Sequence, residues 1–522
     1  INMPIKTNDN RDISDQIVKN LGWAQLPIGK TLREQLTVEG VSLWDVMTPS
    51  MALYYIPFSI SSIEHTNSFF KKIRPYLTYN KHRFNNYITR MRNTISKNEN
   101  TMHKSSFMFM GFNNYMYNDA LAPLAEQLKP VHEKKIIVLN DAVNLKESTP
   151  HSNYIQFKST WQYWNKEVSK EVLIFKNKTD VSILELHKIL KLTNFSFNNE
   201  YSQEIINHAF HWLLHFDLPL LANQVVLARN IIKQCKPSLL ISADVADIRS
   251  RVFTLLAKQE NIPTLEIQYG SCSENSYEWQ FLLADHIATW GKRSREHFLK
   301  HGVLDCQMTV TGTSRSDSLA RVNNSLIKKT KSQLGIQNDS VVILFASTYV
   351  QKEYAKFSNS DLMKKAIFNA ANKMNGLKLI VKPHPLENTE ETRSMLELEK
   401  NIIFTDSNID IRTLISVCDV FIGLGTTATI DAMVAKKLII CPVFGDWAWS
   451  DWLVQSDAML VPHSEREIEE IFINILGGSV EKIKASLRPA QEKFINEMIY
   501  KPDGLSGERI LQLAYKLANK HG

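Results

Sequence analysis

The segment at 377–385, LKLIVKPHP, ends an apolar run with Lys382, His384 and Pro385. The run predicts a buried strand, and its prolines stop the chain that follows from continuing as a helix. An ammonium group and an imidazole at such a strand end can donate hydrogen bonds to a phosphate oxygen. A turn that carries a histidine by chance fits the segment equally well, so the pattern alone leaves both readings open.

A second candidate anion site lies at 420–434, VFIGLGTTATIDAMV, where a strand is followed by Gly425, Thr426 and Thr427 and then by a helix. Free backbone N–H groups and the positive end of the helix dipole favour an anion there. Asp431 lies about one helical turn further on and could accept a hydrogen bond from a ribose hydroxyl. A threonine cap that only stabilises the helix is the alternative.

Two more hydroxyl residues, Ser347 and Thr348, follow the predicted strand 341–346. Because the carboxyl ends of parallel strands meet at one edge of a sheet, they would reach the same phosphate. They could equally cap a helix without touching a ligand.

Carboxylates that could act on a sugar carbon lie in the N-terminal half. The segment 239–251, LLISADVADIRSR, ends an apolar strand and leads into a helix that carries Asp244. A carboxylate at this position can act as a general base or a nucleophile, although an N-cap aspartate would look the same. Glu266, within a predicted strand, and Glu274, in the loop after it, are the second choices.

Other kinds of chemistry are disfavoured. His208, His211 and His215 are spaced for one face of a helix, but no carboxylate motif beside them completes a site, so we predict no metal centre. The sequence has no P-loop, no GxGxxG after its first strand and no GxSxG, which argues against kinases, dehydrogenases and serine hydrolases. Its five cysteines include no CxxC pair and form no disulfide framework.

Alternating strands and helices must position these residues. From about residue 105, short apolar runs alternate with longer amphipathic segments, which is typical of parallel sheets covered by helices on both faces. Each of two series has five or more strands, so we expect an α/β fold of two Rossmann-like, doubly wound domains that face a cleft. The predicted strands are 106–111, 135–140, 171–175, 238–242, 264–269, 286–290 and 308–311 in the first series, and 341–346, 378–382, 402–405, 420–423, 438–442 and 459–461 in the second.

The predicted domains follow from these series. Residues 1–100 form a helical N-terminal region, 101–320 the N-terminal Rossmann-like domain, 321–485 the C-terminal nucleotide-binding domain, and 486–522 the final helices. The apolar stretch 51–60 and the basic segment 71–92 after it could rest on an anionic membrane surface, or they could be helical core with a solvated flank.

Charge and composition limit the partners. Lys and Arg total 61 against 54 Asp and Glu, a formal charge of +7 that is spread along 522 residues. Nucleic-acid binders concentrate basic residues in one stripe, so we expect no nucleic-acid partner. No apolar run is long enough to span a bilayer, and no signal peptide opens the chain, which favours a cytoplasmic enzyme.

In several blocks that occur in order, the chain resembles bacterial surface-polysaccharide glycosyltransferases of the GT-B fold. The blocks are IPTLEIQYG (262–270), ADHIATWGKRSREHFLKHGV (284–303), VTGTSRSD (310–317), KPHP (382–385) and CDVFIGLGTTATIDAMVAKKLIICPVF (418–444). KPHP and the threonine-rich loop are similar to those of capsule enzymes that use CMP-linked donors, namely 3-deoxy-manno-octulosonic acid (Kdo) transferases and polysialyltransferases. Teichoic-acid polymerases, which use CDP-glycerol, have similar segments.

The resemblance implies roles for the candidate residues. Lys382 and His384 would contact the donor phosphate, and Thr426 and Thr427 would hold it at the helix start. Asp431 would stand at the ribose, where many relatives have glutamate. Asp244 would be the carboxylate on the sugar side. Tyr269 and Gly270 replace the His-Gly often seen in the family, which argues against a histidine base in that loop.

We therefore expect a metal-independent glycosyltransferase without a cofactor. It would move Kdo or another ulosonic acid from a CMP-sugar to a bacterial surface glycan, free or lipid-linked, at the inner face of the cytoplasmic membrane. A UDP-sugar 2-epimerase with the same double-Rossmann plan is one alternative. A non-catalytic subunit that binds glycans is the other.

Overall fold

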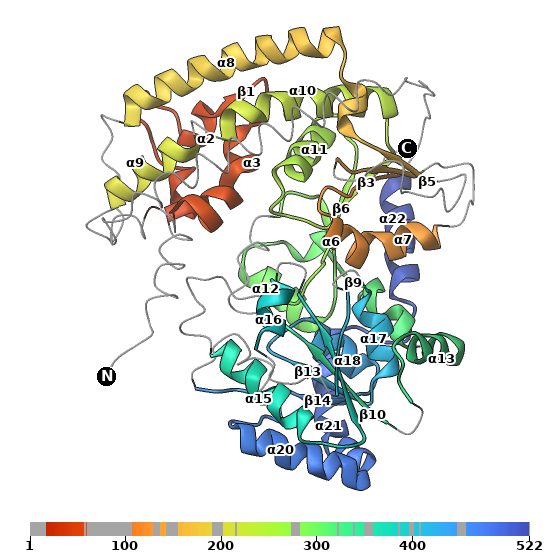
Figure 1. Cartoon of the computed structure of the whole chain (residues 1–522). Helices are drawn as coiled ribbons and strands as arrows, with labels where there is room; N and C mark the ends of the chain where they lie inside the picture. The colour runs from red at the N-terminus through yellow and green to blue at the C-terminus, as the bar shows by residue number, and fades with distance from the viewer. Residues whose placement is uncertain are drawn as a thin grey trace.

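The computed structural model of the chain is drawn in Figure 1. It describes residues 17–56, 59, 107–128, 136–141, 155–190, 202–213, 217–272, 282–320, 323–337, 340–348, 359–384, 387–395, 401–406, 409–445 and 456–520. Two parallel β-sheets, of seven and five strands, form its framework.

The N-terminal sheet has the strand order β5-β4-β3-β6-β7-β8-β9. Every neighbouring pair is parallel. The order reverses between β3 and β6, and folds of this kind bind ligands beside that reversal, outside the carboxyl ends of the strands. The strands are β3 (Phe107–Met110), β4 (Ile136–Leu139), β5 (Ile155–Lys158), β6 (Leu239–Ser242), β7 (Thr264–Ile267), β8 (His286–Thr289) and β9 (Met308–Val310).

The C-terminal sheet has the order β12-β11-β10-β13-β14 and is also parallel throughout. Its order reverses between β10 and β13. The strands are β10 (Val341–Ala346), β11 (Leu377–Lys382), β12 (Ile402–Phe404), β13 (Val420–Gly423) and β14 (Leu438–Ile440). The prediction of two doubly wound domains is confirmed, and both sheets offer a ligand-binding reversal point.

Helices cover both faces of each sheet, because successive side chains of a strand point to opposite faces. In β3, Phe107 and Phe109 pack with α7 (Ala122–Gln127) and α22 (Ser506–Lys520). Met108 and Met110 pack on the opposite face, with α10 (Leu218–Cys235) and α11 (Ile248–Gln259). Since both faces are buried, the strands read as unbroken apolar runs, which is why the sequence predicts them well.

The remaining helices complete these layers. On the N-terminal domain they are α6 (Asn114–Met116), η2 (Tyr117–Leu121), η3 (Thr160–Tyr163), α8 (Lys166–Leu190), α9 (Ser202–Trp212), α10 (Leu218–Cys235), α11 (Ile248–Gln259), α12 (Lys292–Lys300) and η6 (Asp305–Gln307). In the rest of the chain they are η7 (Ser314–Ala320), α13 (Asn324–Gln333), α15 (Ser360–Asn372), α16 (Thr389–Arg393), α17 (Ile411–Val417), α18 (Ala428–Val434), α20 (Glu465–Asn474), η9 (Ile475–Ser479) and α21 (Val480–Met498).

The N-terminal helical region packs onto an insertion between β5 and β6. Its described elements are α2 (Leu32–Gln35), β1 (Thr37–Val38), β2 (Val41–Ser42), α3 (Leu43–Ser50) and η1 (Met51–Tyr55). They share one apolar core with α8, α9, α10 and α11. Met51 and Ile56 are fully buried, so the described part of the 51–60 stretch is core and not a membrane-facing surface. The basic segment 71–92 lies outside the described residues.

Two predicted strands differ in the structure. The segment 459–461 forms only an isolated parallel bridge, between Leu460 and Ile440, in place of a strand. Residues 171–175, EVLIF, belong to the 25-residue helix α8, and the third strand of the sheet is β5. The run is rich in β-formers, but Val168, Phe175 and Leu186 are buried at helical spacing against the insertion core, and this packing overrides local propensity. The strand β5 is a half-buried edge strand, so its short segment lacks an unbroken apolar run.

The chain crosses between the two domains twice. The segment from β9 through η7 leads to the C-terminal domain, and the segment after α21 returns to α22 on the N-terminal sheet. The two crossings contact each other, because the Asp317 carboxylate accepts hydrogen bonds from the backbone N–H of Ser506 (3.1 Å) and Gly507 (2.7 Å). These bonds fix the start of α22 against the linker.

We expect the docking of α22 to stabilise the N-terminal domain. Ile510 is 1% exposed in the core beneath β3 and β6, so Ile510→Ala should lower the free energy of unfolding by about 2–5 kcal/mol. Leu505→Ala, just before the same helix and 40% exposed, is the matched control and should change it by less than about 1 kcal/mol. Urea unfolding measures both, and equal losses would show that α22 is not part of the domain core.

Candidate functional site

The C-terminal domain brings three predicted segments to one sheet edge. In the ladder, Ala346 of β10 pairs with Lys382 of β11 on one side and with Gly423 of β13 on the other. The three strands therefore end at the same level. The segments that follow them leave the sheet side by side, at 347–348, 382–384 and 424–427. The KPHP segment and the threonine loop thus lie on one edge, at the reversal between β10 and β13.

A buried carboxylate, Glu387, holds the chain that follows KPHP. It accepts hydrogen bonds from Lys364 Nζ (2.6 Å), Thr392 Oγ1 (2.6 Å) and the backbone N–H of His384 (3.0 Å). Burial raises its pKa, but the charge of Lys364 and these hydrogen bonds outweigh burial and leave the pKa below the usual value. Glu387 is therefore an anion that fixes the backbone from which the His384 side chain projects.

The same carboxylate determines the role of Ser347. The Ser347 Oγ donates a hydrogen bond to Glu387 Oε1 (2.8 Å), and Ser347 is buried. The hydroxyl therefore braces the loop, in contrast to the predicted contact with a phosphate. Thr348, next along the chain, is half-buried at the sheet edge.

Lys382 and His384 both have a pKa below the ordinary value, and burial is the main cause in each case. Asp410, Asp406 and Asp119 partly oppose this shift at Lys382. Asp119 belongs to the N-terminal domain, so the carboxyl end of β11 lies within electrostatic reach of the opposite domain. His384 is accordingly neutral at pH 7 and can still donate one ring N–H. Pro385 lies outside the described residues.

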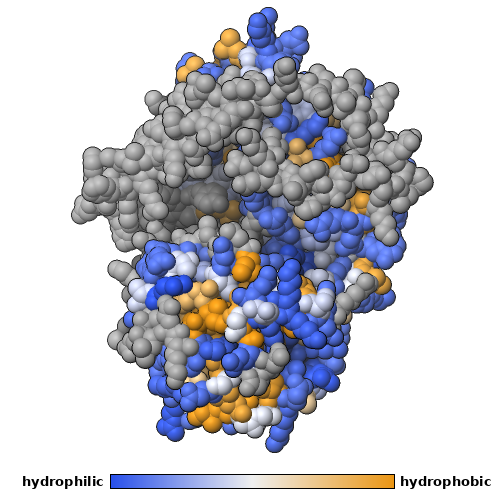
Figure 2. All heavy atoms as spheres, turned by 45° about the vertical axis from the view of Figure 1, so that its right-hand side comes forward, coloured by the Kyte–Doolittle hydropathy of each residue, from blue (hydrophilic) through white to orange (hydrophobic). Residues whose placement is uncertain are grey.

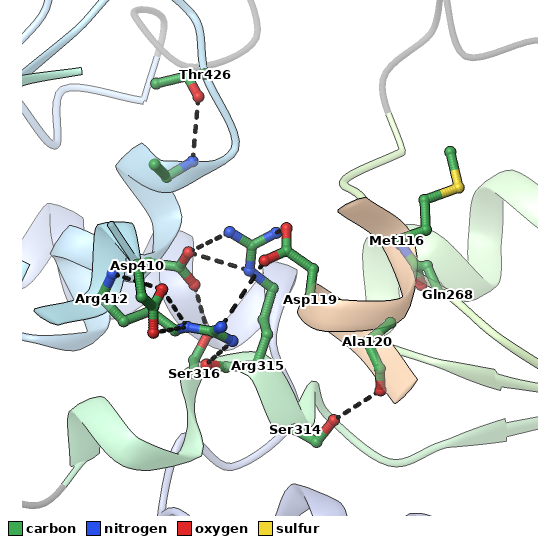
Figure 3. Close-up of polar contacts among 12 residues, drawn as sticks. Met116, Asp119, Ala120, Gln268, Ser314, Arg315, Ser316, Asp410, Arg412 and Thr426 are labelled. Carbon is green, nitrogen blue, oxygen red and sulfur yellow. Dashed lines mark hydrogen bonds and ion pairs between the residues drawn. The ribbon is translucent and has the colours of Figure 1, made fainter. Parts of the chain in front are cut away.

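The threonine loop makes a tight turn into α18. Gly425 has φ +75°, a conformation that glycine adopts without strain. The Thr426 hydroxyl accepts a long hydrogen bond from the backbone N–H of Ala428 (3.4 Å), and residues 425–427 are partly exposed (Figure 3). Thr427 is the N-cap residue of α18 but caps it with no side-chain bond. Both threonines are therefore at the surface where a ligand would meet the start of this short helix.

Asp431 faces the protein interior. It is 1% exposed, and its two oxygens accept hydrogen bonds from Ser316 Oγ (2.7 Å) and from Arg315 Nε (3.0 Å) and Nη2 (2.5 Å). The predicted contact with a ribose hydroxyl would require this buried pairing to open. The structure instead gives Asp431 the role of an internal anion for Arg315.

Arg315 joins the two domains at the linker. Besides Asp431 of α18, it binds Asp119 of η2 through Nη1 (3.1 Å), and all three side chains are buried. Arg412 of α17 donates to the Arg315 carbonyl oxygen (3.2 Å), and it pairs with Asp410 and, at 3.9 Å, with Asp119. Figure 3 shows the Asp119, Arg315, Asp410 and Arg412 side chains converging from separate elements. A charged cluster therefore fixes how the two sheet edges meet.

Asp244 lies at the carboxyl end of β6, beside the reversal of the N-terminal sheet. Its carboxylate accepts from the backbone N–H of Ala246 and Asp247 (both 3.1 Å), and it is not the helix cap, because Asp247 caps α11. Burial, and after it the charge of Asp247, raises the pKa of Asp244 to about 6. A half-buried carboxylate with such a pKa can take up and release a proton near neutral pH.

Glu266 has a different environment. It is 3% exposed within β7, accepts a hydrogen bond from Ser242 Oγ, and leaves its Oε1 without a hydrogen-bond partner. Burial raises its pKa to about 8, so it is a neutral acid at pH 7. The buried Arg251 lies close enough to lower that pKa, and it donates to the Val245 carbonyl oxygen (2.7 Å). Glu266 thus supports the Asp244 turn from beneath and lies too deep to touch a substrate.

Predicted positions besides Pro385 also give no test. Glu274 lies outside the described residues, as does His215. His208 contacts Ser59 Oγ (3.0 Å) and the Trp212 indole within the helical core, in agreement with a partly buried helix face. The described residues hold no group of three or more His, Cys, Asp or Glu side chains placed for a metal ion.

Sequence reasoning missed Glu387 and Arg315. Glu387 follows KPHP by two residues and Arg315 lies within VTGTSRSD, so both belong to segments already singled out. Charged residues in or just after such segments usually lie in solvated loops. Only the tertiary contacts show that these two side chains are buried and paired.

The sheets, their order and the helix that crosses back define an enzyme fold of the GT-B type. Residues 269–440 match the model of the family described as CDP-glycerol:poly(glycerophosphate) glycerophosphotransferase. No curated protein matches the sequence significantly. Together with the fold, this match over part of the chain supports a nucleotide-sugar-dependent glycosyltransferase.

Solved structures agree on the fold. A variant of the wall teichoic acid polymerase TagF soaked with CDPG has a TM-score of 0.51 and 14% identity, and the match covers 87% of this chain and 99% of that one. The S. aureus MnaA–UDP structure has a TM-score of 0.50 and 15% identity, and the match covers 80% of this chain and 97% of that one. A putative UDP-N-acetylglucosamine 2-epimerase from Listeria monocytogenes has a TM-score of 0.50 and 13% identity, and the match covers 80% of this chain and 98% of that one.

The Glu387 network predicts a strong and local effect on stability. Glu387→Gln leaves Lys364 buried without its counter-charge, so it should lower the free energy of unfolding by about 3–5 kcal/mol. Glu391→Gln, on the exposed side of α16, is the matched control and should cost less than about 1 kcal/mol. Urea denaturation followed by circular dichroism compares them, and a loss of similar size in both variants would contradict a structural role for Glu387.

Proposed function

We propose that this enzyme transfers a sugar from a cytidine-nucleotide donor, held by the C-terminal domain, to a surface glycan that enters over the N-terminal domain. The observation that carries the proposal is the shared level of β10, β11 and β13, which gathers KPHP and the threonine loop on one edge. The Asp244 carboxylate lies at the corresponding reversal of the other sheet.

The C-terminal edge supplies the groups that a leaving phosphate needs. Lys382 and His384 would donate to its oxygens, and the Thr426 and Thr427 segment would donate backbone N–H groups at the start of α18. The Lys382 charge then compensates the negative charge that develops on the departing nucleotide. For this reason we propose a reaction that requires no divalent metal ion and no further cofactor.

Asp244 would act on the sugar side. In an inverting reaction, it would take the proton from the acceptor hydroxyl that attacks the anomeric carbon. In a retaining reaction, it would attack that carbon itself and form a covalent intermediate. Its pKa of about 6 suits the first role, because the carboxylate is then mostly ionised at pH 7 and still able to accept a proton.

Two donors fit this site, and a different observation favours each. KPHP resembles the motif of enzymes that use CMP-linked ulosonic acids, so a CMP-sugar such as CMP-Kdo is our first choice. The family match over 269–440 favours CDP-glycerol as the alternative donor. It would deliver glycerol phosphate in place of a sugar, with the acceptor hydroxyl attacking the phosphorus and CMP leaving. In both cases the nucleotide is a cytidine phosphate.

The assignment of donor and catalytic roles predicts that one variant loses nucleotide binding and another loses turnover. His384→Ala should weaken CMP binding by roughly tenfold or more, because it removes a donor to phosphate. Asp244→Asn should bind CMP normally and lose turnover by roughly a hundredfold or more. Isothermal titration with CMP, CDP, UDP and GDP, together with transfer from CMP-Kdo and from CDP-glycerol, measures both effects. Tighter binding of UDP than of CMP, or lost CMP affinity in Asp244→Asn, would refute the proposal.

The raised pKa of Asp244 predicts the pH dependence. Activity should fall as the pH drops through about 6, because protonation of Asp244 removes the base. Asp247→Asn removes the neighbouring negative charge while keeping a cap for α11, so the acid limb should move to lower pH. The exposed Asp305→Asn serves as the control. If the acid limb of the pH–activity profile does not move in Asp247→Asn, another group carries the proton.

A further inference from the structure

The helix α8 forms an outer layer of the N-terminal domain. Its inner face packs on α10, where Val168, Phe175 and Leu186 are buried, and Lys178 binds Glu39 (2.6 Å) near one margin. Figure 1 shows α8 running along the edge of the molecule farthest from the C-terminal domain. Its 25 residues correspond to a rod about 37 Å long. Its outer face is therefore a long, straight surface.

That outer face is unusually apolar. Leu173, Ile174, Val181 and Leu184 are 60%, 54%, 57% and 62% exposed. Figure 2 shows apolar side chains exposed beside hydrophilic ones at the upper end of the molecule, where α8 lies. At about 100° per residue they fall within one arc of roughly 100°, centred almost opposite the buried residues. Single exposed apolar side chains are common, but four gathered on one face of a helix indicate a surface that meets an apolar partner.

The charges on this face are positive. Lys166, Lys170 and Lys188 fall within the same arc and are exposed, while Glu167 and Glu185 lie just outside one margin and the half-buried Asp180 lies just outside the other. Lysine side chains can extend past inserted apolar groups and place their ammonium groups among anionic headgroups. Leucine and isoleucine between lysines are the pattern of a helix that lies in a membrane interface.

We propose that the outer face of α8 is the surface by which this enzyme rests on an anionic lipid bilayer. Among the described residues, no helix is long and apolar enough to cross a membrane, so contact through α8 would be peripheral. The inference rests on the proposed function in one respect, since a lipid-linked acceptor would then be presented beside the N-terminal domain.

A second copy of the chain fits this face less well. In a symmetric pairing of two α8 helices that overlaps the apolar residues, the axis passes near Asn177, and residue 173 meets residue 181. The same register places Lys166 of one copy against Lys188 of the other. Like charges would then meet at both ends of the contact, whereas an anionic bilayer neutralises all three lysines.

The test is partition of the full chain onto vesicles, without donor or acceptor. Binding should be tighter to an equal mixture of phosphatidylcholine and phosphatidylglycerol than to phosphatidylcholine alone, and salt should weaken it. The variant Leu173→Gln/Ile174→Gln/Leu184→Gln should lose roughly tenfold or more in partition coefficient. The matched control Leu304→Gln/Leu362→Gln/Ile473→Gln removes equally exposed side chains elsewhere and should bind like the unchanged protein.

A second variant tests the charges. Replacing Lys166, Lys170 and Lys188 by serine should reduce binding to the anionic mixture by about fivefold per lysine at low salt and leave little salt dependence. No binding to the anionic vesicles, or equal binding by the α8 variant and its control, would overturn the proposal. So would a dimer in sedimentation that the α8 variant converts to monomer. Because nucleotide titration uses no lipid, failure here is separable from failure of the proposed function.

Discussion

The pairing of Arg315 with Asp119 and Asp431 is the interaction on which the candidate site depends. Each carboxylate belongs to a different domain, and the guanidinium belongs to the linker between them. Burying three charges is costly unless each is compensated, so this geometry tolerates few alternative positions of the two domains. The cluster therefore holds the carboxyl edges of the sheets against each other, which is where we propose that the donor and its acceptor meet.

The carboxylates of the N-terminal edge show how environment separates chemically similar groups. Asp244 is half-buried and ends a strand, so its proton can exchange near neutral pH. Glu266, one strand away, is enclosed and neutral at pH 7. Two acids whose environments separate their pKa values are what acid–base chemistry requires, and here the deeper one supports the turn that carries the other.

The helical layer relates the site to its surroundings. Residues 17–56 and the insertion between β5 and β6 share one core, and this core covers the face of the N-terminal sheet opposite α22. Arg251 ties the two parts together, because it donates to the backbone carbonyl oxygen of Asp45 (3.0 Å) near the Asp244 turn. The layer therefore braces the carboxyl edge of the N-terminal sheet from within and presents α8 to the outside.

The sequence by itself determined the two doubly wound sheets and the segments at their edges, because buried parallel strands leave unbroken apolar runs and strand ends fall at fixed positions in such runs. It placed KPHP and the threonine loop on one edge. Tertiary structure alone decided that 171–175 is helical, that Asp431 and Ser347 face inward, and that Glu387 and Arg315 organise the site. The reason is physical: propensity and spacing act between near neighbours, whereas burial and ion pairing depend on residues that only folding brings together.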